Sequence, residues 1–420
     1  MIVERLQSWA VATATLLLLA AGPASATGER VPGNAHQTGI RGGASHARAA
    51  TSPAYTIHDI GAPGPDSAPY SFNNTGQIFG FSGSDCVVWT GTAYRPLPLL
   101  SPTLLGCLPY GINDANPITG QYEMVGKVST QYLQNASTFA VLANAAGFTK
   151  STIYSAYPDG DMAGVNSNGI SLAIAYFYPA DTLELSGPQF LTAAGATDYL
   201  APLESPVASQ PPVHYVVPQL NYNPNPCAFG GCYINDLNEV LGADYFSAAS
   251  SHPTEALYTV GVPSSLRVLP ISSAYCCVPV ALNNQNQILF NAAGRGSEPV
   301  PTIYNVTTGK MKRALTATQT CPKGLAGYPI GLNNKGEVLG SYAGHCTSTY
   351  FTWDAVHGTQ QLDPQLPAND YTRIYALGVN DNGQILVNLV KGNVYDWGTL
   401  DPVVPPATTK SHSRARSAQN

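Results

Sequence analysis

The sequence is poor in charged residues. Lys, Arg, Asp and Glu make up 10% of the 420 residues, and the formal net charge is −6. Residues 53–405 are more acidic than this total suggests, because they carry 12 Lys and Arg against 23 Asp and Glu, a net of −11. Proteins that bind nucleic acid need clustered Lys and Arg for the phosphates. We therefore expect no nucleic-acid partner.

Long apolar runs are lacking after the first residues. The mostly apolar stretch Ala10–Ala21 is followed by Gly22-Pro23 and by the small-residue sequence Ala24-Ser25-Ala26. The stretch is short for a membrane span, and its flanks are typical of a secretory signal peptide. We predict a signal peptide over 1–26, with an uncleaved anchor as the alternative. The mature chain is then extracellular or periplasmic, without a transmembrane segment.

Motifs of common enzymes and metal sites are missing as well. The eight His residues form no His-x-x-x-His or His-Glu-x-x-His pattern, and no Gly-x-Ser-x-Gly or phosphate-binding glycine loop occurs. A glycosidase would need two facing carboxylates, and spacing does not pair any of the available acidic residues, which are Asp85, Asp244, Glu255 and Glu298. We therefore assign no catalytic residue, no metal and no cofactor, and favour a protein that is not an enzyme.

Turn-forming and strand-forming residues are abundant instead. The chain contains 40 Gly, 34 Pro and 24 Tyr, and 44% of it is hydrophobic. This composition is typical of β proteins and is sufficient for a buried core.

An Asn-rich turn followed by alternating apolar residues occurs seven times. The first Asn residues of successive copies are 40, 53, 69, 48, 50 and 47 residues apart, a spacing typical of propellers and solenoids. Asn, Asp and Gly tolerate the positive φ of tight hairpins. The copies begin at Asn73, Asn113, Asn166, Asn235, Asn283, Asn333 and Asn380.

A second hairpin usually follows each turn, which makes a four-stranded meander, the unit of a propeller blade. The seventh copy lacks a strand, whereas Tyr55–Gly61 is a lone strand before the first turn. We predict an all-β, seven-bladed β-propeller of four-stranded antiparallel blades, closed by this N-terminal strand. The propeller domain spans 53–405, between a disordered linker at 27–52 and a disordered tail at 406–420, and we expect a monomer.

The third copy carries an insertion at 187–232 that is rich in proline. Proline disfavours helices and central strands. We expect an ordered surface loop, or in part a degenerate blade edge. The prolines are Pro202, Pro206, Pro211, Pro212, Pro218, Pro224 and Pro226.

Four stretches share a longer motif: Phe72–Gly80, Ile234–Gly242, Leu332–Gly340 and Val379–Val387. They resemble the HAF family of bacterial extracellular repeat proteins, whose repeat has the form Ile-Asn-Asn/Asp-x-Gly-Gln-Val-Val-Gly. The His-Ala-Phe tripeptide that names the family is absent; for example, Asp85-Cys86-Val87 takes its place. The resemblance covers 55 to about 400 and implies an exported bacterial β-propeller. It supplies no catalytic or binding residues.

All eight cysteines fall in the longer, dissimilar loops, on the face opposite the Asn turns, if the chain folds as meanders. In an exported chain, eight cysteines indicate up to four disulfides. We expect Cys86–Cys107, Cys321–Cys346 and Cys227–Cys232, while Cys276 and Cys277 form a vicinal pair or have other partners. A metal–thiolate site at Cys227-x4-Cys232 is the alternative.

Aromatic and amide residues in the insertion give the only ligand-binding candidates. Tyr215, Tyr222, Asn223 and Phe229 can stack on and hydrogen-bond a sugar or a peptide. The alternative is that these tyrosines pack between blades. The sequence thus favours a secreted, non-catalytic protein that binds a glycan or protein at the cysteine-bearing face, with a carbohydrate-active hydrolase or lyase as the alternative and a purely structural envelope protein as a third interpretation.

Overall fold

The computed structural model describes only part of the chain. The described residues are 55–98, 106–116, 118–129, 136–154, 161–177, 184–192, 197–199, 216–217, 234–244, 254–259, 262, 265, 267–272, 279–292, 300–315, 327–342 and 350–403.

These residues form four-stranded antiparallel sheets, seven in the described part of the chain. Sheet 1 contains β2 (Ser67–Phe72), β3 (Ile78–Ser82), β4 (Asp85–Trp89) and β5 (Tyr94–Pro96). Sheet 2 contains β6 (Gly106–Ile112), β7 (Tyr122–Ser129), β8 (Ala136–Asn144) and β9 (Gly147–Tyr154). Sheet 3 contains β10 (Asp161–Val165), β11 (Ile170–Phe177), β12 (Glu184–Thr192) and β13 (Thr197–Tyr199). Within each of these three sheets, neighbouring strands follow chain order.

The C-terminal half repeats this arrangement. Sheet 4 contains β14 (Val216–Val217), β15 (Glu239–Asp244), β16 (Thr254–Thr259) and β17 (Arg267–Ser272). Sheet 5 contains β18 (Pro279–Leu282), β19 (Gln287–Ala292), β20 (Val300–Asn305) and β21 (Lys310–Arg313). Sheet 6 contains β22 (Gly327–Leu332), β23 (Val338–Tyr342), β24 (Tyr350–Asp354) and β25 (Gly358–Gln361), followed by a 3-10 helix at Asp363–Gln365.

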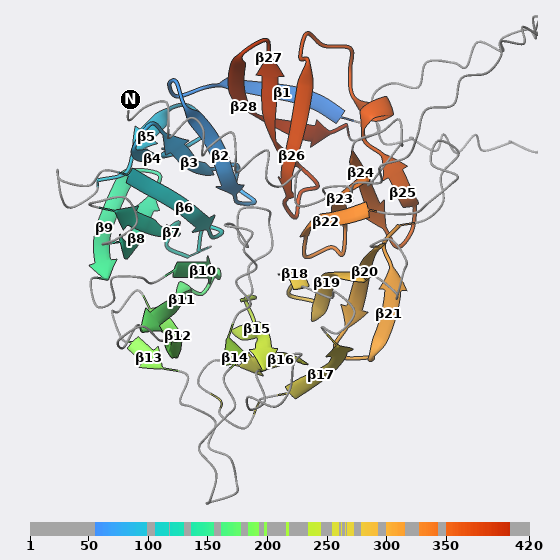
Figure 1. Ribbon diagram of the computed structural model, residues 1–420. Coiled ribbons are helices and arrows are strands. Elements are labelled where there is room, and N and C mark those ends of the chain that lie inside the picture. The colour runs from blue at the N-terminus through green and yellow to red at the C-terminus, as the bar shows by residue number, and fades with distance from the viewer. Residues whose placement is uncertain are drawn as a thin grey trace, which may run out of the picture.

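Sheet 7 combines the two ends of the described chain. β26 (Arg373–Val379), β27 (Ile385–Lys391) and β28 (Val394–Pro402) are joined by β1 (Tyr55–Gly61), which pairs with β28 from Tyr55↔Pro402 to Gly61↔Trp397. Figure 1 shows the sheets in chain order around a common centre, with sheet 7 beside sheet 1. No described helix is long and apolar enough to cross a membrane.

The described parts of the region 187–232 are strands, whereas the sequence predicted a surface loop or in part a degenerate blade edge. The region contributes the end of β12, all of β13 and all of β14. β12 lies between β11 and β13 although it contains Pro188, because the register shifts between the partners of Pro188 and Ser186. Such an irregularity accommodates the missing N–H of proline. The seven prolines named above lie outside the described residues.

A β-bulge occurs at one fixed position of the repeat. In sheets 1, 2, 5 and 6 the register of the first hairpin shifts immediately after Pro69, Pro109, Pro279 and Pro329. Each of these prolines lies four residues before the first Asn of its turn. Because a bulge leaves one residue unpaired, it allows proline inside a strand pair.

The core lies between neighbouring sheets. The second strands of sheets 1, 6 and 7 contribute buried residues to this core, at Ile78-Phe79, Val338-Leu339 and Ile385–Leu389. In sheets 1 and 6, the longer motif must end in Gly because an aromatic ring lies too close to leave room for a Cβ atom. A Cβ at Gly80 would lie 2.4 Å from the Trp397 ring, and one at Gly340 would lie 2.4 Å from the Phe351 ring.

Candidate functional site

The residues predicted to bind a ligand cannot be placed. Tyr215, Tyr222, Asn223 and Phe229 lie outside the described residues, as do six of the eight cysteines: Cys227, Cys232, Cys276, Cys277, Cys321 and Cys346.

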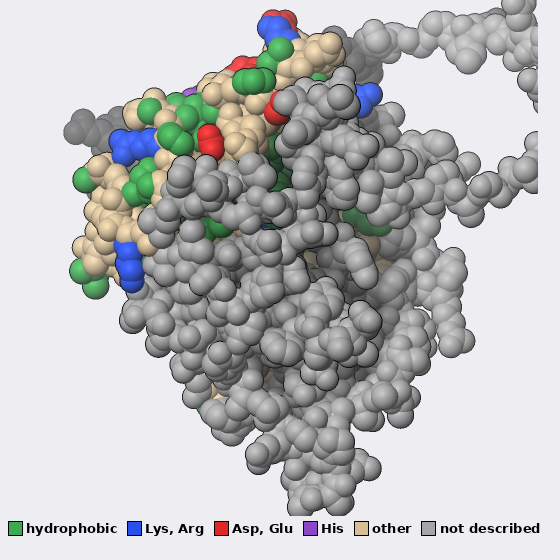
Figure 2. All heavy atoms as spheres, turned by 60° about the vertical axis from the view of Figure 1, so that its left-hand side comes forward, with side chains coloured by type: hydrophobic (Ala, Val, Ile, Leu, Met, Phe, Trp, Pro, Cys, Tyr) green, Lys and Arg blue, Asp and Glu red, His purple; other side chains and the backbone are tan. Residues whose placement is uncertain are grey.

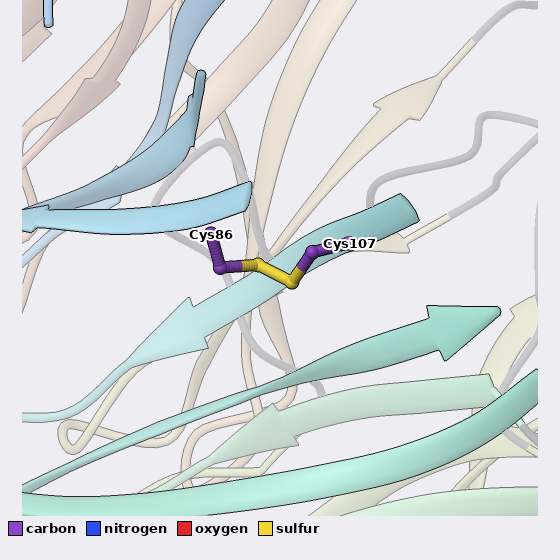
Figure 3. The surroundings of a disulfide bond; sticks show 2 residues. All are labelled: Cys86 and Cys107. Atoms are coloured by element: carbon purple, nitrogen blue, oxygen red, sulfur yellow. A yellow bond between two sulfur atoms is a disulfide. The ribbon is translucent and has the colours of Figure 1, made fainter. Parts of the chain in front are cut away.

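Cys86 and Cys107 form a disulfide, as expected from the sequence, with Cα atoms 5.4 Å apart (Figure 3). Cys86 is near the start of β4 and Cys107 near the start of β6, so the bridge links sheets 1 and 2. Both residues are buried, in a cluster that includes Phe79, Met124 and Phe139. β6 runs from Cys107 to the Asn113 turn, so the bridge lies at the strand ends away from the Asn turns.

The Asn turns themselves meet in a cyclic hydrogen-bond network. The side-chain Nδ2 of the first Asn in each turn donates to the backbone carbonyl of the first Asn in the next turn. We call this set of seven residues the Asn hub. The donor–acceptor distances are 3.0 Å for Asn73–Asn113, 2.7 Å for Asn113–Asn166, 3.0 Å for Asn166–Asn235, 3.2 Å for Asn235–Asn283, 3.0 Å for Asn283–Asn333, 2.9 Å for Asn333–Asn380 and 3.2 Å for Asn380–Asn73.

Each hub Asn also organises its own turn. The Oδ1 atom of Asn333 accepts hydrogen bonds from the backbone N–H of Lys335 (3.1 Å) and of Glu337 (2.9 Å), while its Nδ2 donates to Glu337 Oε2 (3.1 Å) as well as to Asn380. Asn380 makes the same bonds with Asn382 and Gln384. All four hydrogen-bonding positions of the amide are used. Asp would lack the donors, so the turn requires Asn, and all seven hub residues are buried.

The fourth residue of the turn has positive φ in six of the seven copies, which explains the Gly or Asn at this position. The residues are Gly76, Gly169, Asn238, Asn286, Gly336 and Gly383. Gly and Asn adopt this conformation most easily.

The second residues of the turns form a further set of contacts between sheets. In six of the seven steps, the backbone N–H of one second residue donates to a side-chain oxygen of the next, at 2.6–2.8 Å; the donors are Asn74, Ser167, Asp236, Asn284, Asn334 and Asp381. Some of these second residues are Asn and others are Asp, so amides lie beside carboxylates. Asn74 Nδ2, for example, donates to both Asp114 (2.6 Å) and Asp381 (2.8 Å). Burial raises the pKa of Asp114, and the nearby Asp381 and Asp236 raise it further.

A group of acidic and aromatic residues lies at the end of sheet 7 away from the Asn turns. The hydroxyl of Tyr371 donates to Asp59, near the end of β1. Burial and the nearby charge of Asp59 raise the pKa of Asp396 in β28, while Lys391 opposes this shift. Lys391 itself lies 3.4 Å from Asp370. Sequence spacing could not bring Asp59 and Asp396 together, because 336 residues separate them and only the pairing of β1 with β28 does so.

The four acidic residues that the sequence offers for catalysis are not gathered into one group within the described residues. Asp85 is exposed at the start of β4 in sheet 1. Asp244 and Glu255 lie at neighbouring register positions of β15 and β16 in sheet 4, and Glu298 lies outside the described residues. No group of three or more His, Cys, Asp or Glu suited to a metal ion occurs within the part of the chain that the structure describes.

Comparison with known proteins gives only distant similarity. No family model matches the chain, and no curated protein matches it. Among solved structures, the acylaminoacyl peptidase of Pyrococcus horikoshii is 9% identical over 77% of this chain and 50% of its own, with a TM-score of 0.43. This chain thus spans half the length of that peptidase.

Two further solved structures match at the same level. The β-propeller domain of the Trilobed protease from Pyrococcus furiosus is 9% identical over 70% of this chain and 97% of its own, with a TM-score of 0.37. TolB from Acinetobacter baumannii is 11% identical over 80% and 79%, with a TM-score of 0.36. At these values the similarity carries no functional argument, so the proposals below depend on the geometry of the chain itself.

Proposed function

We propose that the chain is a secreted, non-catalytic β-propeller of seven four-stranded blades, closed by β1, that binds a glycan or a protein at its disulfide-bearing face. The membership in the HAF family that the turn motif suggests belongs to the same proposal. The Asn hub is the observation that carries it. Seven turns linked in one cycle, from Asn73 to Asn380 and back, fit sheets arranged around an axis.

The hub also separates two ends of the molecule by their chemistry. At one end, the side-chain amides and backbone groups of the seven Asn turns, six of them nearly uniform, hydrogen-bond to one another, so these turns serve the structure. At the other end lie the Cys86–Cys107 bridge and the longer connections. Binding residues concentrate in dissimilar loops held by a rigid scaffold, so we assign recognition to the disulfide-bearing end.

Binding by the secreted full-length chain tests this assignment. We expect saturable binding to at least one member of a glycan and protein array, and at least a tenfold loss of affinity in Tyr215→Ala and Tyr222→Ala, because aromatic truncation removes stacking surface. Val356→Ala is the control, since Val356 is 84% exposed in the turn between β24 and β25, on the hub side. Retained affinity in both tyrosine variants would refute the assigned site.

A hydrolase or lyase is the second candidate, and the Asp59–Asp396 pair is the observation that favours it. A general acid needs a raised pKa, and Asp396 has one through burial and the nearby Asp59. Turnover of a polysaccharide by the wild-type chain that is lost in Asp396→Asn and in Asp59→Asn would establish this activity. Turnover unaffected by both changes would exclude this pair from the chemistry.

A further inference from the structure

β21 (Lys310–Arg313) is a cationic edge strand. It is the last strand of sheet 5, pairs with β20 alone among the described strands, and lies at the outer edge of the molecule in Figure 1. All four of its residues are exposed, and so are residues 307–309 before it. Lys310, Lys312 and Arg313 place three positive charges on four residues, a quarter of the 12 Lys and Arg in 53–405.

These charges are not neutralised by carboxylates in the described part of the chain. Arg267 pairs with Glu239 at 3.1 Å and Lys391 with Asp370 at 3.4 Å, whereas no described acidic residue forms an ion pair with β21. Lys312 instead lies 4.9 Å above the Trp353 ring. On the side of the molecule turned forward in Figure 2, by contrast, the described charged side chains are scattered among hydrophobic and other residues.

The backbone of β21 is open for a further strand. Ala314 N–H donates to the carbonyl of Pro301 at 2.8 Å, which makes 301 and 314 a hydrogen-bonded pair. Since antiparallel pairing alternates, the N–H and C=O groups of Met311 and Arg313 point away from β20. Met311 adds an apolar side chain that is 53% exposed.

Protection of the sheet edge is the simpler explanation, since lysines on edge strands discourage association between sheets. Edge protection does not explain why β21 in particular is so basic. β25 of sheet 6 is also a four-residue last strand, with the sequence Gly-Thr-Gln-Gln, and carries no charge. Edge protection also gives no reason for an exposed Met between the lysines.

We propose that β21 binds an acidic peptide in extended conformation, which adds to sheet 5 as a fifth strand. Main-chain hydrogen bonds to Met311 and Arg313 would provide affinity, as in other cases of strand addition. Lys310 and Lys312, on one face of the strand, select acidic side chains, and Met311, on the other face, contacts an apolar residue. The site lies apart from the disulfide-bearing face, so it does not depend on the function proposed above.

Binding of the full-length chain to a ten-residue peptide of alternating Glu and Val tests this inference. We expect saturable binding that weakens at least tenfold in Lys310→Gln/Lys312→Gln and between 50 and 300 mM salt. Arg373→Gln/Lys391→Gln removes the same charge from the exposed ends of β26 and β27 and should leave affinity unchanged. Equal melting temperatures of the three proteins confirm that the fold is intact.

Two further ligands identify the mode of binding. The same peptide N-methylated at alternate residues should not bind, because it cannot complete the strand ladder, and the Gln/Val peptide should bind at least tenfold more weakly. The proposal would be overturned if the N-methylated peptide bound as tightly as the unmodified one. It would also be overturned if the chain bound polygalacturonate but did not bind the peptide. Aggregation of the β21 variant with no peptide binding by the wild type would overturn it as well, and would leave edge protection as the role of the strand.

Discussion

Asn380 donates its side-chain amide to the backbone carbonyl of Asn73 at 3.2 Å, across 307 positions of sequence. Asp381 repeats the contact one residue further, because its backbone N–H donates to Asn74 Oδ1 at 2.6 Å. The last Asn turn therefore contacts the first through the same bonds that join turns adjacent in sequence. β1 and β28 bring the same two ends of the chain together at sheet 7.

Replacing a hub Asn by Asp should destabilise the fold strongly. Asn380→Asp keeps the oxygen that accepts from Asn382 and Gln384 but removes both donor bonds, to Asn73 and to Gln384. Two lost hydrogen bonds and a buried charge correspond to a decrease of about 3–4 kcal/mol in the free energy of unfolding. Denaturant titration measures it.

The matched control is Asn393→Asp, in the exposed turn between β27 and β28. It should change the free energy of unfolding by less than about 0.5 kcal/mol. Equal decreases in the free energy of unfolding for the two variants would show that the hydrogen bonds of the Asn hub do not stabilise the fold.

The buried carboxylate of Glu337 should make stability depend on pH. Burial raises its pKa above the ordinary value of 4.5, while Asn333 and Lys335 oppose the shift and Asp354 adds to it. Because the folded chain holds this proton more tightly than the unfolded chain, the contribution of Glu337 to stability falls as pH rises from about 4.5 through the raised pKa.

Glu337→Gln should therefore stabilise the protein at pH 7 and change little at pH 3. The amide keeps an oxygen for Asn333, as Gln384 does for Asn380 at 2.9 Å. Denaturant titrations of both proteins across this pH range give the difference. A variant that is less stable than wild type at pH 7 would show that the carboxylate is favourable where it lies.

Removing the first strand should abolish soluble expression. Deletion of residues 53–61 exposes the edge of β28 and removes Tyr55 and Ile57, which uncovers Leu389 and Leu400, the residues they pack with. An uncovered strand edge invites association with other chains. Soluble yield and gel filtration check this; a stable, monodisperse truncation would show that sheet 7 does not need β1.

The Cys86–Cys107 bridge should stabilise the chain by about 3 kcal/mol, as expected for a loop closed over 21 residues. Cys86→Ala/Cys107→Ala should lower the free energy of unfolding by about this amount, and reductant should then have a smaller effect on the variant than on the wild type. An unchanged free energy of unfolding would show that the covalent link contributes nothing to the stability of the contact between sheets 1 and 2.

The turns and strands could be predicted from sequence because the signals are local. Asn, Gly and apolar alternation mark each first hairpin, and the bridge between Cys86 and Cys107 followed from their places in the meander. The bulges were missed, although Pro69, Pro109, Pro279 and Pro329 recur at one position of the repeat.

Other features could not be read because they depend on contacts between distant segments. The hub bonds of Asn380 to Asn73, and the proximity of Asp59 to Asp396, arise only once β1 lies against β28. The charge of β21 is visible in the sequence, but its free edge follows from the position of the strand within sheet 5.

Diffraction from crystals of the chain tests the central claim most directly. We predict electron density in which the side-chain amide of each hub Asn lies within hydrogen-bonding distance of the next hub carbonyl, including Asn380 to Asn73, with β1 paired to β28. An elongated stack of sheets, or two separate units with Asn73 and Asn380 far apart, would contradict the account.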